Sequence, residues 1–453
     1  MSDFHCLGKI TQVAAEEYRS WGLNPKVKQQ AYVVQGNFSR DQVSTSSMQS
    51  WLPFGCGSSY GDVCLNDEGL LLDTQKLDRF LGFNKQSGVL RCQSGVTLRS
   101  INHMFVKRGW FLPVTPGTQN VTIGGAIAND VHGKNHHQAG SFGCHIRRLG
   151  LYRSEEGNIE CAPDENHELF NATIAGLGLT GFIQWADIQL KAVPGPYLKT
   201  EKMVFRSLQE FSDLASNADR DYEYTVAWID SVASTRQIGR GVFFCGNHAS
   251  VSTGKIPYEK KKLVVPCNAP AGLLSYPAVK LFNKLYFTAH QLTPKMSQVF
   301  YEPFFYPLDS ISHWNRLYGK QGFYQYQCVV PVENGVDLVR ELLMICSHYA
   351  NGSFLSVLKK FGDIKSPGML SFPRPGYTLA LDFRNLGKST HEMFAELDKI
   401  VFANHGALYP AKDARMSREG FRQSFPDHET FLKYIDPMFS SNFLNRVIRG
   451  DVH

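Results

Sequence analysis

The chain has 453 residues, which is enough for two or three domains with cores of their own. Hydrophobic residues make up 43% and charged residues 19% of it, as in ordinary water-soluble globular proteins. A formal net charge of +6 with scattered basic residues excludes a nucleic-acid-binding role. The one tight basic run, residues 260–262 near Lys255, has two interpretations: a solvated loop, or a patch for an anionic membrane or a lipid phosphate.

The N-terminal twenty residues contain no apolar stretch long enough for a signal peptide. No run of about 18 apolar residues occurs anywhere, so the sequence predicts no transmembrane segment. Ten cysteines at irregular spacing lack any CxxC or metal-binding pattern, which predicts buried free thiols in a reducing compartment. We therefore expect a cytoplasmic protein, either free or peripheral at the inner membrane.

Residues 53–62, PFGCGSSYGD, form the first of two glycine-rich segments. Three glycines and two serines in one loop can present successive main-chain N–H groups to phosphate oxygens, and a plain surface turn is the alternative. The loop lacks both the GxGxxG spacing before a helix and a P-loop lysine, which argues against a nicotinamide fingerprint.

The residues around this loop and up to residue 195 predict short strands joined by turns. We expect strands at 69–73, 89–92, 149–153 and 159–161, a hairpin turn at 155–158, a helix at 164–175, a glycine loop at 176–181, a strand at 182–193 and a domain boundary at 194–196.

Residues 113–145 form the second glycine-rich segment, with six glycines and four histidines. Gly124 and Gly125 lead into a predicted helix whose free N–H groups would face a diphosphate. His132 and Lys134 then place cationic or proton-handling groups beside that turn, although a structural histidine at a helix end is the alternative for His132. No carboxylate or cysteine completes a tetrahedral zinc site nearby. Two such loops predict a dinucleotide held between subdomains.

The second half of the chain mixes strands and helices. We expect strands at 224–230, 322–331 and 377–383, and helices at 335–349 and 391–404. Period-2 alternation places Gln325 and Gln327 on one strand face, where they either bind sugar hydroxyls or form an exposed polar face. Lys359 and Lys412 are either solvated surface groups or, next to a flavin, groups that stabilise developing negative charge.

Thirteen short runs, in order across nearly the whole chain, resemble one known family. They are SYGD (59–62), PGT (116–118), VTIGGAIA (121–128), HGKNHH (132–137), AGSFG (139–143), GLTG (178–181), YTVAWID (224–230), PLD (307–309), WNR (314–316), QYQ (325–327), SFL (353–355), LSFP (370–373) and AKD (411–413). The chain resembles flavoproteins of the vanillyl-alcohol oxidase superfamily, and within it the flavoprotein subunits of decaprenylphosphoryl-β-D-ribose 2-epimerases.

The resemblance implies an α+β fold with a two-subdomain FAD-binding domain of the vanillyl-alcohol oxidase (PCMH) type. This domain would be split in sequence around an α+β substrate domain built on an antiparallel sheet. The expected division is 1–195 for the FAD-binding domain, 196–406 for the substrate domain and 407–453 for a segment returning to the first domain.

The implied activity is FAD-dependent oxidation of the 2-hydroxyl of a polyprenyl-phosphoryl pentose to a keto-sugar, in cell-envelope polysaccharide synthesis. A separate short-chain NAD(P)H-dependent reductase would complete the epimerisation. Two alternatives remain: a sugar-1,4-lactone oxidase, and a non-catalytic flavoprotein scaffold in a glycan-assembly complex.

The resemblance also assigns residues to roles, in this chain's own numbering. The implied FAD contacts are Pro53, Gly55, Gly57, Ser58, Ser59, Tyr60, Gly61, Asp62, Val63, Gly117, Thr118, Thr122, Ile123, Gly124, Gly125, Asn129, Val131, His132, Ile183 and Tyr409. The implied substrate contacts are Tyr60, Lys134, Gln325, Gln327, Lys359, Thr378 and Lys412. Lys412 would hold the reacting hydroxyl and compensate charge on the reduced flavin, and a desolvated lysine can also act as a base. His132 would hold flavin and sugar in register.

Three positions depart from the pattern of relatives. The first glycine loop, GSSYGD, contains no histidine for covalent attachment of the flavin, so we expect non-covalent FAD. Ala380 stands where family members carry a cysteine, which removes the target of inhibitors that attack that thiol. Thr378 replaces a neighbouring asparagine, which leaves the identity of the sugar open.

Overall fold

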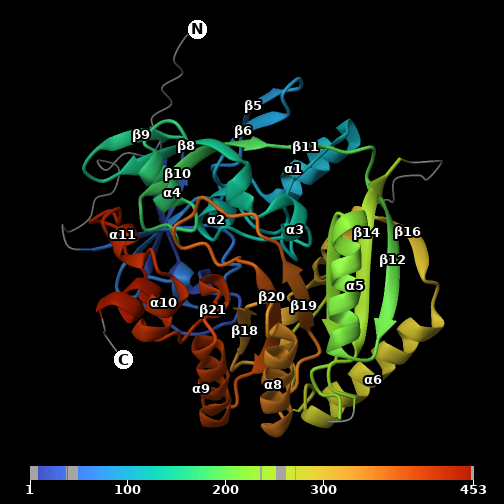
Figure 1. Cartoon of the computed structure of the whole chain (residues 1–453). Coiled ribbons are helices and arrows are strands. Elements are labelled where there is room, and N and C mark those ends of the chain that lie inside the picture. The colour runs from blue at the N-terminus through green and yellow to red at the C-terminus, as the bar shows by residue number, and fades with distance from the viewer. Residues whose placement is uncertain are drawn as a thin grey trace.

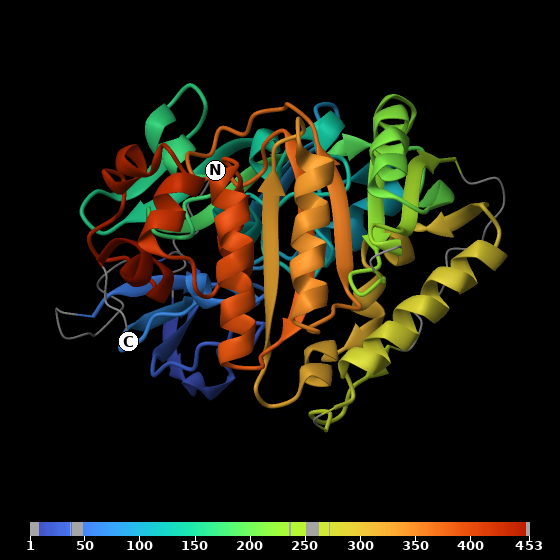
Figure 2. The ribbon, with the colours of Figure 1, turned by 60° about the horizontal axis from the view of Figure 1, so that its bottom comes forward.

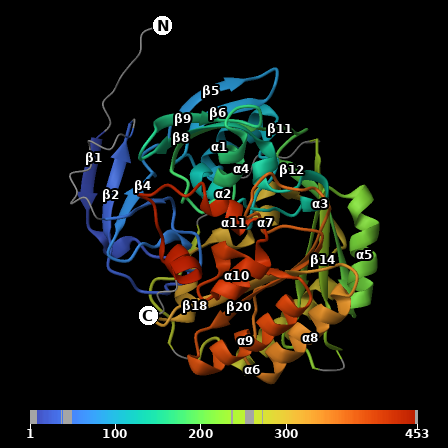
Figure 3. The same cartoon turned by 60° about the vertical axis from the view of Figure 1, so that its left-hand side comes forward.

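Three β-sheets carry the fold in the computed structural model, which describes residues 9–36, 38, 49–234, 237–250, 262–270 and 272–449 (Figures 1 and 3). Most of the basic run near Lys255 lies outside the described residues. The nine cysteines of the described part are free, and five of them are buried. In that part, no helix combines the length and the apolar character needed to cross a bilayer.

The first sheet has four strands in the order β1 (Lys9–Val13), β2 (Gln30–Gln35), β4 (Leu70–Asp73) and β3 (Trp51–Phe54). β4 pairs in parallel with both β2 and β3, and every residue of β4 is buried. An uninterrupted apolar run of this kind is typical of parallel strands covered on both faces. The parallel pairing directs the chain after Phe54 into the loop at 55–62.

The second sheet is antiparallel and follows the first along the chain. Its order is β5 (Phe80–Asn84), β6 (Val89–Gln93), β10 (Phe182–Gln189), β8 (Ile146–Arg153) and β9 (Gly157–Cys161). The helices beside it are α1 (Leu98–Phe105), α2 (Ile123–Ala128), α3 (His136–Ala139) and α4 (His167–Thr173). α1 and α2 bury Ile101, Ile123 and Ile127 in the same apolar core as this sheet. The second glycine segment is thereby anchored at its middle.

The third sheet has eight strands and most of the remaining chain. Its order is β16 (Met296–Phe300), β12 (Tyr197–Phe205), β14 (Gly241–Ala249), β13 (Tyr224–Ile229), β19 (Ser356–Phe361), β20 (Gly376–Arg384), β18 (Phe323–Val330) and β21 (Ala407–Leu408). Two-stranded pairs join β7 (Trp110–Phe111) to β11 (Lys191–Ala192) and β15 (Leu263–Val264) to β17 (Ile311–Ser312).

Helices cover one face of the large sheet and leave much of the other face to line a cavity. α5 (Leu208–Asp221), α8 (Gly335–His348) and α9 (Lys388–Ala403) lie side by side on one face (Figure 2). α6 (Tyr276–Leu292) packs Phe287 against Trp228 and Val242, away from α5. α7 (Tyr301–Phe305) packs in a cluster with Phe111 and Tyr224. The side chains of β18, β19 and β20 on the face away from α8 therefore point towards the glycine loops.

The C-terminal segment closes the molecule over the first glycine loop. It contains α10 (Arg418–Ser424), α11 (His428–Leu432) and α12 (Asn442–Leu444). The Asn442 N–H donates to Leu65 O at 2.8 Å. The Arg446 guanidinium bonds Asp62 at 2.7 Å and Asp413 at 3.0 Å. One buried cation thus ties the end of the first loop to the residue that follows Lys412.

Most predicted elements are present, and the differences have local causes. The predicted strands at 224–230, 322–331 and 377–383 are confirmed as β13, β18 and β20. The predicted hairpin turn at 155–158 is present between β8 and β9 but lies at 154–156, because Gly157 already pairs with Arg153. The predicted helix at 164–175 is shorter, because Asn166 and Ala175 both have positive φ. The strand at 182–193 ends at Gln189, and residues 191–192 pair separately with β7.

Candidate active site

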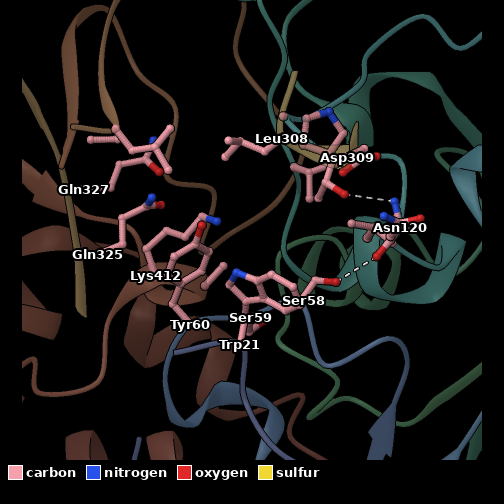
Figure 4. Close-up of a pocket in the computed structure, with 18 of the residues that line it drawn as sticks. Trp21, Ser58, Ser59, Tyr60, Asn120, Leu308, Asp309, Gln325, Gln327 and Lys412 are labelled. Carbon is pink, nitrogen blue, oxygen red and sulfur yellow. Dashed lines mark hydrogen bonds between the residues drawn. The ribbon is translucent and has the colours of Figure 1, made fainter. Parts of the chain in front are cut away.

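A cavity of about 1140 Å³ lies between the two glycine-rich segments and the open face of the large sheet. Pockets for a single small ligand span roughly 300–1,000 Å³, so this cavity has room for a dinucleotide and a second ligand. Figure 4 shows Gln325, Gln327 and Lys412 on one side of it and Asn120 and Asp309 on the other. We call these sides the sheet wall (β18, β19, β20 and Lys412) and the loop wall (residues 53–63 and 115–134).

The loop wall presents main chain to the cavity. Gly117 has open space where a Cβ would stand, whereas a Cβ on Gly55 would lie 2.4 Å from Thr122 Oγ1. Ser58 Oγ donates to Asn120 O at 2.8 Å and joins the two glycine segments (Figure 4). Within the described part of the chain, no protein acceptor pairs with the N–H groups of residues 56–59. Adjacent free N–H groups of this kind form a concavity suited to an anion.

The start of α2 does not offer the free N–H groups that we expected from the sequence. Ile123 N donates to Val96 O and Gly124 N to Ser94 O, both at 2.8 Å. The Thr122 hydroxyl caps the helix by accepting from Gly125 N at 3.2 Å. These donors are satisfied within the protein, so the free main-chain donors of the loop wall lie in the first glycine loop instead.

Most of the predicted site residues line the cavity, and three do not. Those on the cavity wall are Pro53, Gly55, Gly57, Ser58, Ser59, Tyr60, Val63, Gly117, Thr118, Thr122, Gly124, Gly125, Asn129, Val131, His132, Lys134, Ile183, Gln325, Gln327, Lys359, Thr378, Tyr409 and Lys412. Ile123 is fully buried in the core of the second sheet. Gly61 packs against Asp413, where an added Cβ would lie 1.8 Å from the carbonyl oxygen. Asp62 points to Arg446 and supports the loop from behind.

Several buried polar atoms on the cavity wall have no partner among the described residues. They include Ser94 Oγ, Asn129 Oδ1 and Asp382 Oδ2. An unpaired buried polar atom costs free energy, of the order of 1–3 kcal/mol. All three residues line the same cavity, which is the pattern expected when a polar ligand completes the site.

His132 lies at the junction of the two walls. Its Nε2 is 2.9 Å from Gln327 Nε2, and its Nδ1 is 3.2 Å from Lys359 Nζ. Burial, reinforced by the Lys359 charge, lowers the pKa of His132 well below its usual value, so the ring is neutral. A neutral ring has one N–H, and Lys359 donates to Nδ1. The amide of Gln327 must therefore turn its oxygen towards Nε2–H.

Three partly buried lysines, Lys134, Lys359 and Lys412, face the cavity without a carboxylate within ion-pair distance among the described residues. Burial lowers the pKa of Lys134 to about 7 and that of Lys359 to about 7. The Lys134 ammonium donates to Phe304 O and lies 4.5 Å from the centre of that ring. The Lys412 ammonium lies 3.8 Å from the Tyr60 ring centre. Cations without a carboxylate partner in such a site favour anionic ligands or groups that become anionic during a reaction.

Asp382 is the carboxylate of the sheet wall, and sequence reasoning gave it no role. Its Oδ1 accepts a short hydrogen bond from Gln325 Nε2, and its Oδ2 is buried and unpaired. Burial raises the pKa of Asp382 to about 7, and burial lowers the pKa of Lys412 to about 8 against the opposing pull of Asp382. A carboxyl and an ammonium that both titrate near neutrality can exchange a proton with a bound hydroxyl.

A signal for Asp382 was present in the sequence. It shares one strand face with Thr378 and Ala380, and all three line the cavity. What the sequence could not supply is the register that pairs Asp382 with Gln325 across β18 and β20. Trp21 and Phe304 also line the cavity and were missed, because single aromatic residues carry no spacing signal.

Comparisons with known proteins agree with this geometry. A model described as "FAD binding domain" matches residues 42–161. A decaprenylphosphoryl-β-D-ribose oxidase of Mycolicibacterium smegmatis is 34% identical over 418 residues, which cover 87% of this chain and 88% of that protein. The chain belongs to this oxidase family. The family resemblance inferred from the thirteen sequence runs is confirmed, and the chain is an FAD-dependent oxidoreductase.

More distant relatives of the family are similar over less of the chain or with lower identity. A protein of Streptomyces coelicolor, described as uncharacterized and lying in the mprA 5′ region, is 29% identical over 78% of this chain and 100% of its own. An L-gulonolactone oxidase of Scyliorhinus torazame is 24% identical over 38% of this chain and 39% of its own. Similarity to the lactone oxidases is therefore limited to about a third of the chain.

Proposed function

We propose that the protein oxidises the 2-hydroxyl of a polyprenyl-phosphoryl pentose, of the decaprenylphosphoryl-β-D-ribose kind, to the 2-keto sugar with FAD as cofactor. The observation that carries this proposal is the set of charged groups on one large cavity: Lys359, Lys412 and Asp382 of the sheet wall and Lys134 of the loop wall. The same cavity is lined by the first glycine loop with its free N–H groups. The family relation to an oxidase of that name supports the choice of substrate.

The residues on the cavity wall fit an FAD. The free N–H groups of residues 56–59 suit a diphosphate, and the open space at Gly117 admits a ligand close to the main chain. Asn129 Oδ1 and Ser94 Oγ are unpaired acceptors or donors beside it. We propose that FAD binds non-covalently, because the first glycine loop has no histidine. Denaturation should release all yellow colour into the filtrate, and colour retained on the chain would contradict this proposal.

The sheet wall supplies the proton chemistry of the proposed reaction. A bound flavin supplies the hydride acceptor. Lys412 holds the reacting hydroxyl with its ammonium, which the Tyr60 ring keeps in place. Asp382 Oδ2 takes the hydroxyl proton, while Gln325 fixes Asp382 Oδ1. Neutral His132, held between Gln327 and Lys359, orients the sugar against the loop wall.

The domain organisation that we expected from the resemblance is also kept as a proposal. The four- and five-stranded sheets, which would be the two subdomains of the FAD-binding domain, contain only strands from residues 9–189. The strands from 197–384 all belong to the eight-stranded sheet or to the short pair that includes β15. Residues 436–446 contact the first part of the chain, in support of a returning segment, although β21 joins the large sheet.

The proposed product is a ketone that needs a second enzyme. We propose a short-chain NAD(P)H-dependent reductase as that partner, since reduction from the opposite face would complete the 2-epimerisation. The lipid tail of the substrate favours work at a membrane surface, with the protein in the cytoplasm or peripheral at the inner membrane. Cell-envelope arabinan or a related polysaccharide would be the destination of the sugar.

Anaerobic mixing of the FAD-loaded protein with decaprenylphosphoryl ribose tests the proposal. We expect bleaching of the flavin absorbance and, after a candidate reductase and NAD(P)H are added, formation of the 2-epimer. L-gulono-1,4-lactone is the matched control, and bleaching by the lactone alone would favour a lactone oxidase. Tight FAD binding without bleaching by any polyprenyl-phosphate sugar would favour a non-catalytic flavoprotein scaffold.

A further inference from the structure

Exposed apolar side chains gather around α6 at one edge of the molecule, in yellow in Figure 2. Of the thirteen large apolar side chains that are exposed among the described residues, eight fall between residues 263 and 296. They are Leu263, Val264, Leu273, Leu281, Phe282, Leu285, Leu292 and Met296. Isolated exposed apolar residues are ordinary, but a concentration of them marks an interaction surface.

α6 has two apolar faces. Val279, Asn283 and Phe287 are buried against the sheet. Leu281 and Leu285, spaced by one turn, lie on the opposite side and are 59% and 61% exposed. A surface helix of a globular protein normally turns polar residues to solvent. The exposed leucines of α6 therefore indicate that its outer face contacts another apolar surface.

The charge around this face is of one sign. Between residues 262 and 300, the described part of the chain contains four lysines and no aspartate or glutamate. Lys280 and Lys284 lie on α6 beside the exposed leucines, and both are exposed. This rim complements the anionic headgroups of a membrane leaflet. A second copy of the chain would place the same lysines against one another, which like-charge repulsion opposes.

α6 also contributes to the wall of the cavity. Ala278 and Phe282 of α6 line the cavity, and Phe282 contacts the Phe354 ring at 5.8 Å between centroids. Phe282 is at the same time exposed at the surface. One apolar side chain of α6 therefore belongs both to the cavity wall and to the exposed surface of the helix.

We propose that the outer face of α6 docks on an anionic membrane leaflet. The helix then lies in the headgroup region with Leu281 and Leu285 inserted and with Lys280 and Lys284 among the lipid phosphates. The part of the cavity wall that α6 supplies is then next to the bilayer, so a polyprenyl tail stays in the membrane while the sugar enters the cavity. This last step rests on the proposed function, whereas the docking itself does not.

Co-sedimentation of the FAD-loaded protein with phosphatidylcholine vesicles, with and without phosphatidylglycerol, tests the docking. We expect binding only to the anionic vesicles, and loss of binding at high salt. L281Q/L285Q should lower partitioning at least about 10-fold, since two buried leucines are lost. K280E/K284E should lower it at least about 25-fold, from roughly 5-fold for each lysine. M344Q, at an exposed apolar position of α8, is the matched control and should bind normally.

Equal binding to neutral vesicles, or normal binding by L281Q/L285Q, would overturn the proposal. Dimerisation that L281Q/L285Q abolishes, without vesicle binding, would overturn it in favour of an interface between copies. Flavin bleaching by a short-chain, water-soluble substrate should be equal in wild type and variants, and only turnover of vesicle-borne long-chain substrate should fall. Vesicle binding without any bleaching would support the surface and reject the proposed substrate, so the two proposals fail separately.

Discussion

The two walls of the cavity are built from different parts of the peptide. The loop wall offers main-chain N–H groups and the space left by glycines such as Gly117. The sheet wall offers charged and polar side chains from adjacent strands, among them Gln325 and Asp382. Main-chain N–H groups suit the diphosphate, which is present in FAD whatever the substrate. Side chains, by contrast, determine which substrate is oxidised. This difference predicts that substitutions in the loop wall lower the affinity for FAD. Substitutions in the sheet wall should slow flavin reduction by substrate and leave FAD bound.

The largest effect is expected from Lys412→Ala in the sheet wall. Loss of an ammonium that stabilises developing negative charge should slow flavin reduction by substrate about 10³-fold. FAD should remain bound, because the free N–H groups of residues 56–59 do not depend on the Lys412 side chain. Stopped-flow absorbance at the flavin band measures the rate, and Lys399→Ala on the exposed side of α9 is the control. A Lys412→Ala protein that is reduced at the normal rate would rule out this role.

Asp382→Asn should slow flavin reduction about 10²-fold, since it removes a proton acceptor. In the wild type the rate should rise as pH passes about 7, where Asp382 loses its proton, and fall above about 8, where Lys412 loses its own. These two limbs belong to the interacting pair. Asparagine still accepts from Gln325, so the variant should lose the acidic limb of the pH–rate profile. Its basic limb should move to lower pH, because Lys412 loses the carboxylate that raises its pKa. An unchanged acidic limb would show that another group accepts the proton.

His132→Ala tests the junction between the walls. The substitution leaves Lys359 and Gln327 without their shared partner and should lower kcat/KM roughly 30-fold through misplacement of the sugar. FAD content should fall little. His137→Ala is the control, because His137 Nε2 hydrogen-bonds the main-chain oxygen of Tyr222 and His137 is not one of the described residues on the cavity wall. Steady-state kinetics with a short-chain substrate make the comparison, and unchanged turnover in His132→Ala would count against the assignment.

The smallest effect is expected in the loop wall. Gly117→Leu fills cavity space, so FAD affinity should fall about 10-fold, as overpacking costs about 1–3 kcal/mol. The stability of the FAD-free protein should change by less than about 0.5 kcal/mol. Gly82→Leu is the control, since Gly82 also has no neighbour within 4 Å of an added Cβ but lies in β5 away from the cavity. Fluorescence titration with FAD should separate the two variants, and equal affinities would place the cofactor elsewhere.

Local patterns in the sequence were enough for much of the sheet wall. Alternation of polar and apolar residues predicted β18 and β20, and it placed Gln325 and Gln327 on the same face. Strand period depends only on neighbours along the chain, so it can be seen in one sequence. The contact between Gln325 and Asp382 depends on register across two strands, which local patterns do not determine.

Two other features, at the start of α2 and on α6, could not be predicted from local patterns in the sequence. The N–H groups at the start of α2 are bonded to Ser94 and Val96, almost thirty residues earlier, so no local rule could show that they are occupied. α6 carries apolar residues on both faces, so it lacks the single apolar stripe by which an amphipathic helix is recognised. For α2 the deciding contact is a tertiary hydrogen bond. For α6 it is the proposed contact with a membrane.

Arg446 makes the site depend on a segment that contributes no described residue to the cavity wall. It bonds Asp62, at the end of the first glycine loop, and Asp413, next to Lys412. Arg446 also follows every strand of the three sheets along the sequence. The first glycine loop and the residue next to Lys412 are therefore cross-linked only when this segment has folded against both. A nonsense codon shortly before Arg446 should leave all the strands of the three sheets in the chain and yield a protein that retains little FAD.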